Sequence, residues 1–223
     1  FVTLFESNVL ASLTRMDASS NGISVLPLEL AQTPVSAPLS SLNFRGNHLG
    51  RGVEEGLSLS WAPTTLTSLD VSDNGLSSAQ LGTIASEVAN LQHLEASGNA
   101  LTSWPEVLNR TSKRGLREVR LSNNRLTDLA SFDASAFSQL EILDLSGNSL
   151  RELMDVDWAS LEKLNTLDLS NNDISSVPYQ LGFLRPLEKL NLYGNPTRMI
   201  RQALVQGPTA KLKEHLRSRA PAS

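Results

Sequence analysis

The sequence contains no cysteine among its 223 residues. Without thiols the chain cannot be a disulfide-capped extracellular repeat domain, hold a thiolate zinc site or use a cysteine nucleophile. It also lacks any apolar run near the roughly 20 residues that a membrane-spanning helix needs. We therefore expect an intracellular protein, cytoplasmic in location, that makes no membrane contact.

The sequence motifs of common catalytic sites are missing as well. No G-x-x-x-x-G-K-[ST], H-E-x-x-H or G-x-S-x-G pattern occurs, and His48, His93 and His215 are isolated from one another. Asp144 and Asp168 are adjacent carboxylates, but no further ligand set for a cation accompanies them. We predict that the protein is not an enzyme, needs no cofactor or metal and takes no small-molecule substrate.

One pattern is repeated along the chain. The stretch "LNTLDLSNNDI" from Leu164 matches L-x-x-L-x-L-x-x-N-x-L, and eight copies recur at spacings of 23 to 27 residues. The apolar positions alternate with outward ones as in a short strand, and no copy can bury its apolar edge alone. Each copy, here called a rung, should therefore stack on the next as a parallel strand.

Every rung carries an Asn at the point where its strand ends and the chain turns inward. A buried amide must find hydrogen-bond partners, and backbone groups of neighbouring turns can supply them. We expect these residues to form a structural Asn ladder rather than a catalytic site. The ladder comprises Asn21, Asn47, Asn74, Asn99, Asn124, Asn148, Asn172 and Asn195.

The pattern and its spacing resemble those of leucine-rich repeats. The resemblance implies an α/β solenoid shaped as a curved horseshoe, with a parallel β-sheet on the concave face and short helices or turns on the convex face. The segments between strands, here called return segments, include 77–92, which has Leu81, Ile84, Val88 and Leu91 at helical spacing. The return segments also contain Trp61, Trp104 and Trp158, which are expected to pack in the convex-side core instead of forming a ligand cage.

The chain divides into a solenoid over 1–195 and a basic helical cap over 196–223. Residues 1–12 have the pattern of the end of a preceding return segment, whose apolar residues need a cover, so we expect the native protein to extend upstream. In the cap, one apolar face is predicted at Ile200, Ala203 and Leu204 and another at Leu212 and Leu216. Thr209 is expected at the start of the last helix.

The cap carries a finer resemblance. Gly194-Asn195-Pro196 is followed by Arg198 and Arg201, then Gly207, Thr209-Ala210, Leu216-Arg217 and Pro221. This end of the chain resembles the C-terminal end of the family of the intracellular leucine-rich repeat-containing protein forty, from which Pro208 is a departure. The resemblance implies an intracellular protein-binding horseshoe without catalytic residues.

The outward strand residues on the concave face are the candidates for partner contacts. One row is mostly acidic, and it is interpreted either as a groove for basic side chains or as ordinary solvated Asp residues. Arg, Tyr and an outward Ile on such a face favour an interface. The predicted partner-binding residues are Arg45, Asp70, His93, Glu95, Arg120, Ile142, Asp144, Thr166, Asp168 and Tyr193.

Basic residues form two clusters in an otherwise acidic chain of net charge −4. Such clusters are typical of contacts to phosphates or to acidic partners, although only 5% of residues are aromatic, which disfavours base stacking. The candidate residues are Arg110, Lys113, Arg114, Arg117, Arg125, Lys211, Lys213 and Arg217.

The sequence therefore predicts a non-catalytic scaffold that binds a partner protein through its concave face. Two alternatives stay open. In the first alternative, the protein is a ribonucleoprotein or large-complex subunit that contacts RNA phosphates through its basic clusters. In the second, it is a regulatory subunit docked on an enzyme.

Overall fold

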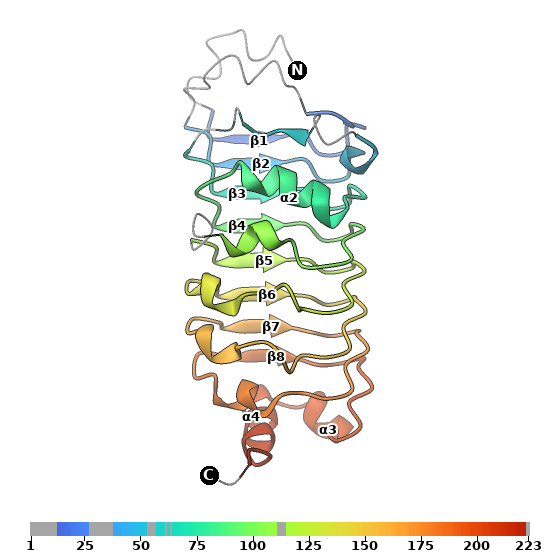
Figure 1. Ribbon diagram of the computed structural model, residues 1–223, viewed down its shortest axis with the longest axis vertical. Coiled ribbons are helices and arrows are strands. Elements are labelled where there is room, and N and C mark those ends of the chain that lie inside the picture. Colours follow the sequence, from blue (N-terminus) through green and yellow to red (C-terminus); the bar gives the residue numbers. More distant parts are fainter. Residues whose placement is uncertain are drawn as a thin grey trace.

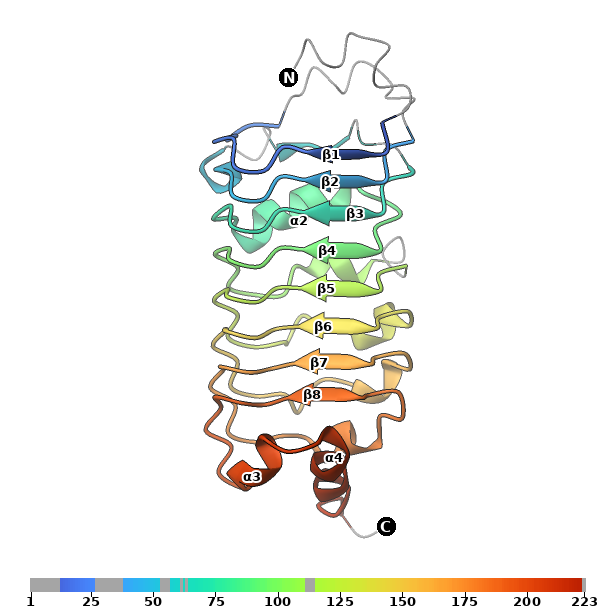
Figure 2. The same cartoon turned by 180° about the vertical axis from the view of Figure 1, so that it is seen from behind.

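The structure is a computed structural model that describes residues 13–26, 38–52, 57–60, 62, 64–110 and 115–221. Its strands form one open parallel sheet in which each strand pairs with the next along the chain (Figures 1 and 2). Within the described residues the eight strands are β1 (Arg15–Asp17), β2 (Ser41–Asn43), β3 (Ser68–Asp70), β4 (His93–Glu95), β5 (Glu118–Arg120), β6 (Ile142–Asp144), β7 (Thr166–Asp168) and β8 (Lys189–Asn191). The predicted solenoid is confirmed.

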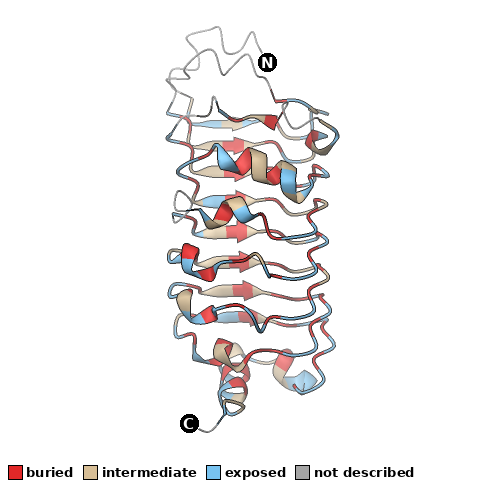
Figure 3. Ribbon diagram, viewed as in Figure 1, coloured by how far each residue is buried: buried red, intermediate tan, exposed pale blue. Residues whose placement is uncertain are grey.

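The strands are short because each rung has only one inward residue between two outward ones. The central residue of β2 to β8 is buried, whereas its neighbours face outward (Figure 3). Parallel pairing keeps like positions in register, so that Asp144 lies beside Asp168 and Ile142 beside Thr166. The concave face is therefore a set of straight rows, each with one residue from every rung.

The Asn ladder holds neighbouring rungs together through buried hydrogen bonds. In rung 3 the Asn74 amide donates to Phe44 O at 2.9 Å and Val71 O at 3.1 Å, and its Oδ1 accepts from Leu49 N at 3.2 Å. The seven ladder residues from Asn47 to Asn195 are all buried. Asn21 differs because it is exposed and its side-chain amide donates to Ser19 O at 2.8 Å. Its backbone N–H donates to Asn47 Oδ1 at 3.0 Å, so the first rung joins the ladder through its backbone.

The residue before each ladder Asn has a positive φ. Glycine occupies this position in alternate rungs, and the rungs between them use Ser20, Asp73, Asn123 and Asn171. Asp and Asn tolerate the left-handed conformation better than most residues do. The repeated "SGN" and "SNN" turns are thus two solutions to one backbone requirement.

The return segments form short helices that cover the other face of the sheet (Figure 1). The predicted helix in 77–92 is α2 (Ser78–Ser86), which begins with a capping box between Ser77 and Gln80. The return segments after β2 and after β4 to β7 contain the described 3₁₀ helices η3 (Leu49–Arg51), η5 (Glu106–Asn109), η7 (Ala134–Phe137), η8 (Trp158–Ser160) and η9 (Tyr179–Phe183).

Two of the three tryptophans lie in the convex-side core, as predicted. Trp104 packs edge-on against Phe132 with the ring centroids 4.5 Å apart, and its Nε1 donates to Asn109 Oδ1 at 3.0 Å. Trp158 is also buried, and its Nε1 donates to Leu153 O at 3.0 Å. Trp61 and residues 1–12 lie outside the described part of the chain.

The cap consists of α3 (Gln202–Val205) and α4 (Thr209–Arg217), which follow β8 (Figure 2). Leu212 and Leu216 are buried as predicted, and Thr209 begins α4 and accepts a hydrogen bond from Leu190 N at 3.1 Å. The predicted apolar face of α3 is partly wrong. Ala203 is exposed and Val205 is buried instead, because α3 has only four residues and turns its last one inward.

No helix in the described part of the chain is long and apolar enough to cross a membrane.

Candidate functional site

The acidic row on the concave face has a structural task that the sequence interpretation missed. Asp70, Asp144 and Asp168 each accept a hydrogen bond at Oδ1 from the backbone N–H two residues later, at 2.9 Å. The serine at that later position adds its hydroxyl to the same oxygen, at 2.5 to 2.7 Å. One carboxylate oxygen therefore caps the turn after the strand, and the second oxygen of Asp168 accepts from Asn191 Nδ2 at 2.9 Å.

The same hydrogen bonding lowers the pKa of Asp17 in rung 1. The side chain of Ser19 is the main cause, followed by the Ser19 backbone N–H. Glu95 caps the equivalent turn, since its Oε1 accepts from Ser97 N at 3.1 Å. Arg120 cannot accept a hydrogen bond in this way. Rung 5 therefore lacks this side-chain cap and also interrupts the row of negative charge.

The centre of the concave face is an ion-pair cluster around Glu118. His93 Nδ1 lies 3.1 Å from Glu118 Oε2, and Arg120 pairs with the other oxygen of the same carboxylate. This cluster lines a hollow of about 410 Å³ together with Asp70 and Glu95. The structure thus brings together four predicted contact residues, and it adds Glu118, whose outward position was visible in the register of the rungs but was not singled out.

Rungs 6 to 8 present a different surface. Ile142 is partly exposed on β6 and lines a hollow of about 590 Å³ at the edge where the chain enters the strands. Glu141, Glu162 and Glu188 line the same hollow, and Lys163 there donates to Gln139 Oε1 at 2.6 Å. An apolar side chain in a charged rim is typical of the centre of a protein interface.

Two further predicted contacts occupy the row that is otherwise mostly serine. Arg45 forms an ion pair with Asp73 at 3.0 Å, and both side chains are about half exposed. Tyr193 is 56% exposed at the far end of the row. Thr166, beside Ile142 on the neighbouring strand, donates its hydroxyl to Asn165 Oδ1 at 2.8 Å.

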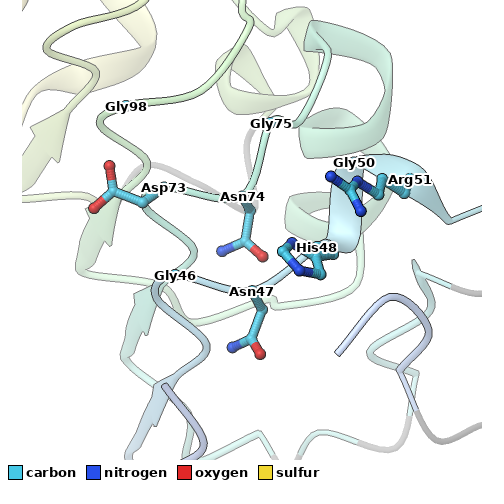
Figure 4. A pocket seen from close by; sticks show the side chains of 9 residues that line it. All are labelled: Gly46, Asn47, His48, Gly50, Arg51, Asp73, Asn74, Gly75 and Gly98. Carbon is cyan, nitrogen blue, oxygen red and sulfur yellow. The ribbon is translucent and has the colours of Figure 1, made fainter. Parts of the chain in front are cut away.

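A hollow at the opposite edge, where the strands end, was not predicted (Figure 4). It measures about 450 Å³, with His48 and Arg51 on one side and Asp73 on the other. Glycines line much of it, because Gly50 approaches the backbone of the next rung and Gly75 adopts a positive φ of 70°. Within the described residues no group of three or more His, Asp and Glu side chains is placed to hold a metal ion.

In the basic cluster of rung 5, two of the described arginines are paired with carboxylates. Arg117 pairs with Glu141 at 2.6 Å, and Arg120 pairs with Glu118. Arg110 and Arg125 are exposed, whereas Lys113 and Arg114 lie outside the described residues.

The cap residues divide in a similar way, and the structure corrects the prediction for Lys213. Its Nζ donates to Leu184 O at 2.5 Å and to Leu187 O at 2.8 Å, and the side chain is buried. Burial lowers the pKa of Lys213, and the nearby Arg217 lowers it further. Arg217 Nε in turn donates to Gly182 O at 2.6 Å, although Arg217 is exposed, as is Lys211.

Comparison with known proteins assigns the family. The Leucine rich repeat model matches residues 114–174 and 138–197, and a second Leucine Rich repeat model matches 62–79. Tsukushi from Gallus gallus is 32% identical over 198 residues, which cover 88% of this chain and 51% of Tsukushi. The chain thus spans about half the length of this curated relative.

Solved structures agree in fold. Internalin C2 from Listeria monocytogenes superposes with a TM-score of 0.64 at 20% identity, over 82% of this chain and 72% of internalin C2. A chain of the Toll–Spatzle complex from Drosophila gives 0.66 at 28% identity, over 82% of this chain and 25% of that one. The LRR ectodomain of the Arabidopsis thaliana receptor kinase GASSHO1/SCHENGEN3, in complex with CASPARIAN STRIP INTEGRITY FACTOR 2, gives 0.58 at 27% identity, over 83% and 22%.

The repeats, the sheet and these relatives make the chain a leucine-rich repeat protein, a class whose fold suggests a role in protein–protein interaction. The finer resemblance of its C-terminal end to the family of leucine-rich repeat-containing protein forty stays a prediction.

Proposed function

We propose that the protein is a non-catalytic scaffold that binds a partner protein through the concave face of rungs 4 to 8. The observation that carries the proposal is Ile142, an outward apolar side chain in a charged hollow on a strand whose backbone is held by the Asn ladder. A fixed backbone lowers the ordering cost of binding, so affinity depends mainly on the outward side chains.

The relatives support a protein partner. Two of the similar solved structures are themselves complexes, Toll with Spatzle and GASSHO1/SCHENGEN3 with CASPARIAN STRIP INTEGRITY FACTOR 2. The ribonucleoprotein alternative is weakened because Arg117 and Arg120 already have carboxylate partners. A regulatory subunit docked on an enzyme would use the same face and differs only in the partner's identity.

We also propose that the scaffold acts inside the cell, because a chain without cysteine has no disulfide to stabilise it outside. Imaging of the full-length protein with a fluorescent tag tests this proposal, and a signal at the cell surface or in the medium would contradict it.

The binding proposal is tested by affinity capture with matched variants. Ile142→Ala should reduce recovery of the partner by about tenfold, because truncating a central apolar anchor removes roughly 1–2 kcal/mol. Met154→Ala is the control, since Met154 is 51% exposed in a return segment and should leave recovery unchanged. Equal recovery with both variants would sink the proposal, and loss only with Arg110→Glu and Arg125→Glu, together with nuclease sensitivity, would establish the RNA alternative.

A further inference from the structure

The last rung and the cap contain a basic stretch that is free of acidic residues. The sequence has no Asp or Glu between Glu188 and Glu214. Residues 1–195 contain 13 of the 19 Lys and Arg and 22 of the 23 Asp and Glu, a net charge of −9, whereas 196–223 carry +5. The five basic residues of the stretch are Lys189, Arg198, Arg201, Lys211 and Lys213.

Most of these cations are free to attract a partner. Lys213 is excluded, because it is buried and bound to two carbonyl groups. The other four are exposed, and no ion pair involves them within the described part of the chain. Elsewhere on the concave side, Arg45, Arg117 and Arg120 are each paired with a carboxylate.

The same stretch carries the two most exposed large apolar side chains of the described residues. Met199 is 70% exposed and Tyr193 is 56% exposed. Tyr193 occupies a position that is serine in most rungs, and its backbone N–H makes the same turn-capping bond, to Asn191 Oδ1 at 3.2 Å. The ring is therefore not needed for the turn. Tyr, Met and Arg are the residue types enriched in protein interfaces.

The backbone beneath these side chains is fixed. Asn195 donates to Leu169 O at 2.8 Å and Leu192 O at 3.0 Å, and it accepts from Ile174 N at 3.0 Å. Thr197 and Ile200 are buried, whereas Arg198 and Met199 between them and Arg201 after them are exposed. The exposed side chains thus stand on an ordered turn, which lowers the cost of binding.

We propose that the surface formed by Lys189, Tyr193, Arg198, Met199 and Arg201, here called the last-rung surface, docks an acidic segment of a partner protein that also carries an apolar side chain. Unpaired cations on a chain that is otherwise acidic give charge complementarity to such a segment. The exposed Met and Tyr supply the apolar contact, which a phosphate chain would not use. This surface shares rung 8 with the concave face proposed above and extends from it into the turn at the end of the solenoid, away from Ile142.

The test uses the whole chain and fluorescence anisotropy with a labelled probe peptide of about ten residues, made of Asp and Glu around a central Phe-Leu pair. The variant Arg198→Glu with Arg201→Glu should weaken binding by about tenfold or more, and Met199→Ser by about threefold. The matched control is Arg51→Glu with Arg151→Glu, two exposed arginines elsewhere with the same change in net charge, which should alter binding less than about twofold. Ile142→Ala should leave binding of the probe peptide unchanged. The peptide assay can therefore succeed or fail independently of the proposal that Ile142 binds a partner on the concave face.

Three results would overturn the inference. The first is no binding of the probe peptide. The second is equal loss in the two double variants, which would reduce the effect to net charge. The third is equally tight binding of a peptide without the Phe-Leu pair, of a single-stranded RNA oligonucleotide or of phosphatidylserine vesicles, since each would make the surface a general polyanion site.

Discussion

At the residue scale, glycine has two separate roles in this solenoid, and Gly50 and Gly75 each show one of them. Gly50 has an ordinary φ, but a Cβ there would lie 2.2 Å from the Gly75 carbonyl oxygen of the next rung. Gly75 has a φ of 70°, and a Cβ there would meet nothing within 4 Å. One glycine permits close approach of two backbones, and the other permits a left-handed conformation.

Alanine substitutions at three glycines should therefore change the free energy of unfolding in a fixed order. Gly50→Ala is expected to cost about 3 kcal/mol, because two backbones must separate, and Gly75→Ala about 1 kcal/mol, because Ala tolerates the left-handed region poorly. Gly82, inside α2 with only Val107 Cγ1 near at 3.8 Å, should gain about 0.5–1 kcal/mol when replaced by Ala. Urea unfolding of the three variants measures this order, and a more severe loss at Gly75 than at Gly50 would refute the assignment.

The turn-capping role of the outward acidic residues was not predicted from the sequence. The repeat predicted that Asp144 and Asp168 face outward, but not that each caps its own turn. The signal was present as Asp-x-Ser in rungs 1, 3, 6 and 7, a spacing that lets the carboxylate reach the amide two residues later. Glu118 pairs across rungs with His93, and that contact depends on the exact register of rungs of unequal length.

At the element scale, α4 shows how packing decides the direction of a charged side chain. Lys213 was predicted to face outward with Lys211, but α4 packs against η9 and turns Lys213 toward the carbonyl ends of that return segment. The Leu184 carbonyl also accepts from Leu187 N at 3.3 Å, so Lys213 adds a second donor there and supplies one to the Leu187 carbonyl. The periodicity of the sequence predicted the apolar face at Leu212 and Leu216, but it did not predict that Lys213 would be buried at the edge of that face.

Replacement of Lys213 should weaken the cap in a pH-dependent way. Lys213→Met leaves the carbonyls of Leu184 and Leu187 without this donor, at a cost of about 1–3 kcal/mol. The folded-state pKa of Lys213 is lowered by burial from its ordinary 10.5, so between the two values the unfolded chain binds more protons. Stability of the wild type relative to Lys213→Met should then rise as the pH increases through that window.

Urea unfolding at about pH 8 and about pH 10 measures this difference. Lys211→Met, on the exposed side of α4, is the control and should change stability little at either pH. A wild-type advantage that falls with rising pH would contradict the buried-ammonium account.

At the scale of the whole molecule, the residues that stabilise the fold are distinct from the outward residues that are available to bind a partner. The inward residues and the Asn ladder follow from the repeat, and they were almost fully predictable because every rung repeats the same requirement. The outward residues differ from rung to rung, so only the structure shows which of them are paired and which are free. Glu118 with His93 and Arg120 is such a paired group, whereas Ile142, Tyr193 and Met199 present apolar surface to solvent.

The central claim is that the concave face of rungs 4 to 8 is the partner-binding surface. The most direct measurement is photo-cross-linking in native-cell extract, with a benzoylphenylalanine replacing Thr166 on β7 or, in the control protein, Met154 in a return segment. The account predicts a nuclease-resistant protein adduct from position 166 that is absent from position 154. Adducts from position 154 alone, or adducts lost after nuclease treatment, would contradict it.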